Sequence, residues 1–133
     1  MARGPGIPLS PLVKARLAAC FPRADLDGVR LHDGIPRYVP GRPAGYVNCD
    51  RIHVACRPER DDDPEWLALL AHEVTHVLQY RRLGAWRFRW AYLKEYLAGR
   101  LRGLCHEAAY RRISFEQAAR EMEERLRRGS SPG

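Results

Sequence analysis

The feature that most constrains this chain is the H-E-x-x-H motif at residues 72–76, which lies inside a long helical pattern. A helix turns about 100° per residue, so side chains four positions apart lie on one face, about one turn apart. The imidazoles of His72 and His76 can therefore reach one metal ion. Glu73 lies on the flank of that face, close enough to act on a water held by the metal. The motif predicts a metal site with the arrangement that hydrolysis requires.

The flanking residues predict where this helix begins and ends. Asp63 is a suitable N-cap, Pro64 suits the first helical position, and Glu65 complements the positive end of the helix dipole. Gly84 is expected to end the helix. The face opposite the histidines carries apolar residues at the spacing of a core-facing helix, namely Leu67, Leu70, Val74 and Val77.

The length of 133 residues predicts one domain, over residues 10–128, between a flexible N-terminus (1–9) and a disordered tail (129–133). Lys14 and Arg16 interrupt the apolar run near the N-terminus, so it lacks the core of a secretory signal. No stretch is long enough to cross a membrane. We therefore expect a cytoplasmic protein, and export without a cleaved signal stays open. The four cysteines are predicted to be free, partly buried thiols.

Local patterns predict an α+β domain with a small antiparallel sheet. Ser10 and Pro11 begin an N-terminal helix that Pro22 ends. Residues 26–33 alternate as a short strand with His32 on the surface, and residues 46–55 resemble a hairpin of two short strands. This hairpin is our candidate for an edge strand that holds substrate backbone by strand addition. A final helix is expected from Ser114, as N-cap of a capping box, to about residue 128.

Residues 86–104 carry a second apolar stripe at helical spacing, which consists of Trp86, Trp90, Leu93, Leu97, Leu101 and Leu104. We interpret this segment as a core helix with solvated arginines on its other faces. The alternative is a basic, aromatic helix that lies on an anionic membrane surface or a protein partner. The formal net charge is +7, and residues 81–112 hold nine basic and two acidic residues, which favours anionic partners. Nucleic acid ranks last, because no nucleic-acid motif supports it.

A catalytic zinc site needs a third protein ligand besides the two histidines and keeps its fourth position open for water. The downstream candidates are His106, Glu107, Glu116, Glu121, Glu123 and Glu124. The extended pattern H-E-x-x-H-x-x-G-x-x-H is absent, since Gln79 and Arg82 occupy its Gly and third His positions; this argues against the metzincin type. Glu116 is the best candidate, because neighbouring alanines allow its helix to approach closely. His106 and Glu107 are the runners-up.

The string L-L-A-H-E-V-T-H-V-L-Q at residues 69–79 resembles small bacterial gluzincin-like zinc metallopeptidase domains whose core is H-E-[LV]-T-H-V-x-Q. Some of these domains are attached to toxins and contractile injection systems. The string V-R-L-H at residues 29–32 is similar to the V-R-x-H strand before their helix. A-Y-R-R-I-S-F-E at residues 109–116 resembles the A-Y-R-x-I-x-F-E ending of stand-alone relatives. The resemblance spans roughly residues 26–120 and departs at Ala118, where relatives often carry a second glutamate.

The resemblance implies a compact zincin-like domain in which two further helices follow the H-E-x-x-H helix. It implies zinc on His72, His76 and Glu116, with Glu73 as general base. Tyr110 or His106 is our candidate to stabilise the oxyanion. We therefore expect a zinc metalloendopeptidase that hydrolyses a peptide or protein substrate. The alternative is a catalytically inactive, zinc-stabilised interaction module that uses the basic aromatic helix 86–104.

Overall fold

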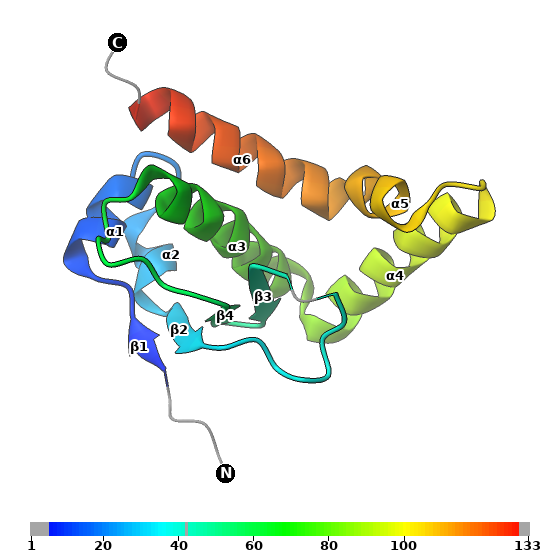
Figure 1. The fold of residues 1–133 in the computed structure, drawn as a ribbon, viewed down its shortest axis with the longest axis horizontal. Coiled ribbons are helices and arrows are strands. Elements are labelled where there is room, and N and C mark those ends of the chain that lie inside the picture. The colour runs from blue at the N-terminus through cyan, green and yellow to red at the C-terminus, as the bar shows by residue number, and fades with distance from the viewer. Residues whose placement is uncertain (1–5, 42, 131–133) are drawn as a thin grey trace.

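The structure is a computed structural model that describes residues 6–41 and 43–130 (Figure 1). Within these residues it has six helices and one four-stranded sheet, which confirms the α+β class. The elements in chain order are β1 (Ile7–Pro8), α1 (Pro11–Leu17), α2 (Arg23–Asp27), β2 (Arg30–Asp33), β3 (Gly45–Asn48), β4 (Arg51–Val54), α3 (Pro64–Leu83), α4 (Ala85–Leu101), α5 (His106–Arg112) and α6 (Ser114–Ser130). Residues 1–5 and 131–133, where we expected flexible ends, lie outside the described residues.

The sheet is mixed, whereas we expected an antiparallel one. Its strand order is β1-β2-β4-β3, in which β2 and β4 run parallel and both outer strands run antiparallel to their neighbours. The parallel pair arises because the long connection after β2 carries the chain to the far edge of the sheet. The predicted hairpin is confirmed: β3 turns back into β4, which then lies beside β2. Strand β3 is therefore an edge strand.

Four local expectations in the first 33 residues were wrong. The N-terminal helix ends at Leu17 and does not continue to Pro22. Ile7 and Pro8 form β1 beside β2, within a segment that we expected to be irregular. Leu26 lies in helix α2, which begins after Pro22, and not in a strand. His32 is buried, because the parallel pairing places it opposite His53 of β4, and the two rings stack with centroids 4.9 Å apart.

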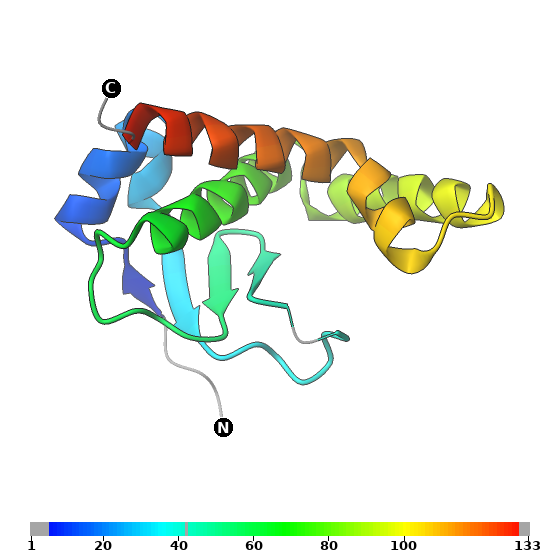
Figure 2. The same ribbon diagram turned by 45° about the horizontal axis from the view of Figure 1, so that its top comes forward.

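Helix α3 forms the middle layer of the molecule. The sheet lies on one side of it and α6 on the other (Figure 2). Its predicted start is confirmed, since the Asp63 carboxylate accepts hydrogen bonds from the backbone N–H groups of Glu65 and Trp66 at 2.9 and 3.1 Å. Its predicted core face is buried as expected, with Leu67, Leu70, Val74 and Val77 each 2% exposed or less. The four cysteines are free, and only Cys20 is partly buried.

A single residue, Gly84, separates the end of α3 from the start of α4. Gly84 caps both helices with a φ of +84°, a left-handed conformation that favours glycine, and the turn sends α4 away from the sheet (Figures 1 and 2). The buried residues of α4 are Phe88 and Gly99. Five of the six residues that we expected in the core are exposed by 45 to 88%, namely Trp86, Trp90, Leu93, Leu97 and Leu101. The sixth, Leu104, lies beyond the end of α4 and is half-buried. We call these five residues the α4 stripe, and their interpretation as a core face was wrong. No helix in the described part of the chain has both the length and the apolar character needed to span a membrane.

Three helices follow α3, one more than we expected. The additional helix, α5, folds back beside α4, where a Cβ at Gly99 would lie 3.0 Å from the Cβ of Ala109. Helix α6 then starts at Ser114, whose backbone N–H and hydroxyl both donate to the Glu95 carboxylate of α4, at 3.1 and 2.9 Å. The carboxylate of Glu95 thus fixes the start of α6 against α4. The helix continues to Ser130, two residues past its expected end.

The contrast between the two apolar stripes predicts that truncating a leucine lowers stability much more in α3 than in α4. Leu70→Ala, in the buried face of α3, should lower the free energy of unfolding by about 2–5 kcal/mol, because it leaves a cavity. Leu97→Ala, in the α4 stripe, should change it by about 0.5 kcal/mol or less, because the side chain is 47% exposed. Urea unfolding of both variants measures the difference. A large loss in Leu97→Ala would contradict the exposed position of the stripe.

Candidate metal centre

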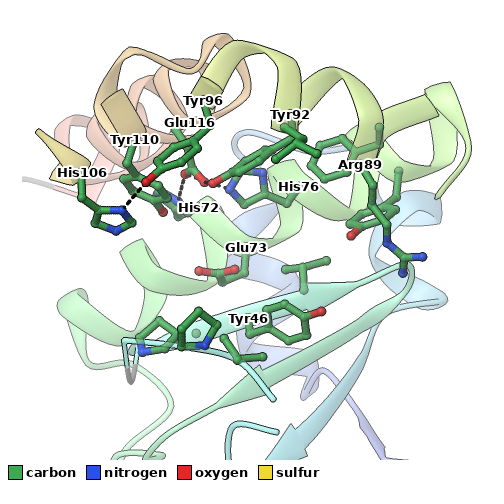
Figure 3. Close-up of a pocket in the computed structure, with 18 residues that line it drawn as sticks. Tyr46, His72, Glu73, His76, Arg89, Tyr92, Tyr96, His106, Tyr110 and Glu116 are labelled. Atoms are coloured by element: carbon green, nitrogen blue, oxygen red, sulfur yellow. Dashed lines mark hydrogen bonds and ion pairs between the residues drawn. The ribbon is translucent and has the colours of Figure 1, made fainter. Parts of the chain in front are cut away.

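The two histidines of the motif converge with Glu116 at the interface of α3 and α6 (Figure 3). The Nε2 atoms of His72 and His76 each lie 3.0 Å from the same carboxylate oxygen, Oε1 of Glu116. The potential ligand atoms of these three residues lie within 4.8 Å of one another. They form a group that could hold a metal ion, and the described residues contain no other such group of three.

The structure thus distinguishes the candidates for the third ligand. Glu116 is 3% exposed and faces the histidines. Glu107 is exposed and pairs with Arg111 at 2.8 Å. His106 lies at the rim, where its Nδ1 is 2.8 Å from the hydroxyl of Tyr96. Position 118 is exposed, so a glutamate there would point away from this group.

Each imidazole is also held through its second nitrogen. Nδ1 of His72 lies 2.5 Å from the Glu123 carboxylate, and Nδ1 of His76 lies 2.8 Å from the side-chain oxygen of Gln79. The Gln79 amide in turn donates to the backbone carbonyl of Phe115 at 3.1 Å. Because both partners are acceptors, they favour the proton on Nδ1 of each ring. The Nε2 lone pairs then point toward Glu116.

This arrangement requires a positive charge between the three groups. Two lone pairs and a carboxylate oxygen at 3.0 Å repel one another unless a proton or a cation lies among them. Burial by itself lowers the pKa of His72, but hydrogen bonds and the charges of Glu73 and Glu116 outweigh it, and the pKa is raised. Burial would raise the pKa of Glu116, yet the contacts with Nε2 of His72 and His76 and the hydrogen bond from Tyr92 hold it well below its usual value. A group of nitrogen and oxygen donors that attracts positive charge in this way fits a divalent metal ion.

Glu73 is placed beside the imidazoles and next to the edge strand. It is 6% exposed, and Figure 3 shows it between the two histidines and the strand that carries Tyr46. Burial raises its pKa above the usual value, while the nearby His76 and His72 oppose the shift. A Cβ at Gly45 would lie 2.8 Å from the Glu73 carboxylate oxygen, so the glycine lets β3 approach this closely. Glu73 therefore faces the space between the metal-ligand group and β3.

A cavity of about 640 Å³ opens onto this group. Its walls come from β3 and the loop before it, from α3, and from α4 and α5. Tyr92 of α4 lines it and donates a hydrogen bond of 2.6 Å to the second oxygen of Glu116. Tyr110 of α5 also lines it, and burial together with the charge of Glu116 raises the pKa of its hydroxyl. Burial and the charge of Glu116 also raise the pKa of Tyr92, so both phenols stay protonated. Tyr92 donates its proton to Glu116, and Tyr110 can act as a hydrogen-bond donor in the cavity.

Three residues of the site were not assigned these roles from the sequence. From the sequence, Gln79 was only a mismatch to a longer motif, and Glu123 was only one of several candidate ligands. No role was predicted for Tyr92, because we interpreted its helix from the apolar stripe alone. Their spacing does carry a signal: Glu123 lies seven residues, or two turns, after Glu116, and Gln79 lies three residues after His76, so each pair shares a helix face.

Comparison with protein-family models, with curated proteins and with solved structures gave no match. The chemical interpretation of this site therefore rests on the residues and geometry of the chain itself.

The contact of Glu123 with His72 predicts a role in metal affinity. Glu123→Ala should weaken metal binding by about 10- to 100-fold, because Nδ1 of His72 loses the acceptor that orients the ring. Competition with a chromophoric chelator measures the affinity. Glu124→Ala is a matched control, since both glutamates pair with an arginine four residues later and Glu124 is exposed. Equal losses in the two variants would contradict the orienting role of Glu123.

Proposed function

We propose that this chain is a zinc-dependent peptidase whose metal ligands are His72, His76 and Glu116. The observation that carries the proposal is the convergence of these three side chains beside the buried carboxylate of Glu73, in a cavity. Three nitrogen and oxygen ligands, with room for a fourth from solvent, are typical of catalytic zinc. The resemblance of the motif to gluzincin-like domains supports the same assignment.

The residues around the site have distinct tasks in this proposal. When bound, zinc supplies Lewis acidity, which makes a water molecule more acidic and polarises a carbonyl group. Glu73 takes a proton from the attacking water and passes it to the leaving amine. Its raised pKa, caused chiefly by burial, brings it closer to the range in which a carboxylate exchanges protons readily. Tyr110 keeps its proton and donates a hydrogen bond to the oxygen that becomes negative.

The edge strand β3 supports a peptide as the substrate. Strand β3 has β4 on one side and an open edge on the other, and its first residue, Gly45, lies against Glu73. An extended peptide can add to such an edge through backbone hydrogen bonds, which places its carbonyl groups beside the carboxylate. We therefore propose a peptide or an extended protein segment as substrate. The alternative is an inactive module that zinc only stabilises, and it does not explain why Glu73 is buried beside β3.

Metal analysis tests the ligand set. Wild-type protein loaded with zinc and dialysed should retain one zinc per chain, and Glu116→Ala should lose it, because two histidines alone hold the ion weakly. Glu107→Ala is the control, since it removes an exposed carboxylate on α5 and should keep the metal. Elemental analysis after dialysis gives the stoichiometry. Retention of zinc by Glu116→Ala would contradict the assignment.

Substitution of Glu73 tests catalysis separately from metal binding. Glu73→Gln should retain zinc but lower peptide cleavage by about 100-fold or more, because an amide cannot accept the proton of the attacking water. Cleavage of a quenched fluorescent peptide library measures the rate, and metal content is determined on the same samples. Glu65→Gln is the matched control, an exposed glutamate in the first turn of the same helix. Unchanged cleavage by Glu73→Gln would exclude it as the general base.

A further inference from the structure

The proposed active site does not account for the exposure of the α4 stripe. Its five residues recur at intervals of three or four along α4, and each is at least 45% exposed, up to 88% at Leu101. At about 100° per residue they fall within an arc of about 80° of the helix surface. Two of the five are tryptophans. An exposed apolar stripe of this kind marks an interaction surface.

Charge on α4 is arranged around this stripe. On the same helical projection, Lys94 and Arg87 border one side of the stripe, and Arg89 and Arg100 border the other. All four side chains are exposed. The acidic residue of α4, Glu95, lies on the opposite face, where it binds the start of α6. The outward face of α4 therefore consists of tryptophan and leucine with basic residues along both edges.

These basic side chains keep their charge available. Among the ion pairs of the described residues, none involves a basic side chain of α4, whereas seven basic residues elsewhere are paired, namely Lys14, Arg57, Arg60, Arg81, Arg111, Arg127 and Arg128. Arg89 contacts neutral groups, the side chain of Asn48 and the ring of Tyr80. The charge on this face is thus not neutralised within the chain.

We propose that α4 docks in the plane of an anionic lipid bilayer, with the α4 stripe in the interface and the basic borders on the lipid headgroups. Tryptophan and leucine on one face with lysine and arginine beside them are the features of helices that lie on membranes. The headgroups of such a membrane carry negative charge, which can pair with the basic side chains of α4. A second copy of this chain fits less well, because a pair joined through the stripe brings basic borders against basic borders.

The position of α4 links this surface to the cavity. Leu93 belongs to the stripe and also lines the cavity, and Arg89 lines the cavity from one basic border. Docking would therefore place the rim of the cavity next to the bilayer. Membrane binding itself needs neither metal nor catalysis, so its test is independent of the proposed peptidase activity.

Co-sedimentation with lipid vesicles tests the proposal. The probes are vesicles of phosphatidylcholine alone and vesicles with equal amounts of phosphatidylcholine and phosphatidylglycerol. Wild type should partition onto the anionic vesicles, less so at high salt, and the emission of the exposed Trp86 and Trp90 should shift to shorter wavelength. Leu97→Glu should lower the partition coefficient by about tenfold or more, and Lys94→Glu by about fivefold or more.

Two controls make the result specific to the α4 stripe. Leu12→Glu changes a leucine of similar exposure on α1, 43% against 47% for Leu97, and Arg23→Glu reverses an exposed charge on α2. Both should bind the anionic vesicles like wild type. Thermal melting checks folding, and Leu101→Glu, at the most exposed position of the stripe, replaces Leu97→Glu if the latter unfolds.

Three results would overturn the proposal. The first is that wild type does not partition onto the anionic vesicles. The second is that the control variants lose binding as much as the stripe variants do. The third is a wild-type dimer in sedimentation velocity that Leu97→Glu converts to monomer, which would assign the stripe to a second copy of the chain.

Discussion

The contact of one Glu116 oxygen with two imidazoles is the interaction on which the rest of the site depends. Buried polar groups are costly unless they are paired, and here the pairing joins two helices that are about 40 residues apart in the sequence. Apolar packing sets the distance, because two fully buried residues flank Glu116, namely Ile113 just before α6 and Ala119 of α6. The core thus holds the carboxylate at the position where it meets both rings. A positive charge among the three groups turns their repulsion into attraction.

Helix α3 contacts each element that contributes to the proposed site. One side meets the sheet, whose edge strand reaches Glu73 through Gly45, and the other meets α6, which supplies Glu116 and Glu123. At its end Gly84 sends α4 outward, so that one face of α4 closes the cavity with Tyr92 while the opposite face stays exposed. The directions of α3, α4 and α6 thus determine where the metal-ligand group, the cavity and the proposed membrane surface lie.

Much of the site could be predicted from the sequence because its determinants are local. The spacing of the two histidines, the cap at Asp63 and the break at Gly84 each depend on a few neighbouring residues. The α4 stripe was misassigned because helical periodicity shows that one face is apolar, but not whether another element covers it. The parallel pair of β2 and β4, the burial of His32 and the extra helix α5 depend on contacts between distant segments, which no local pattern encodes.

The central claim is that zinc binds His72, His76 and Glu116, and X-ray absorption spectroscopy at the zinc edge tests it most directly. The spectrum of the zinc-loaded protein should show a shell of nitrogen and oxygen atoms at about 2.0–2.1 Å, with the multiple-scattering pattern of two imidazoles and no sulfur. A sulfur shell at about 2.3 Å would place the metal on the free cysteines instead. That result, or a spectrum with a single imidazole, would contradict the account.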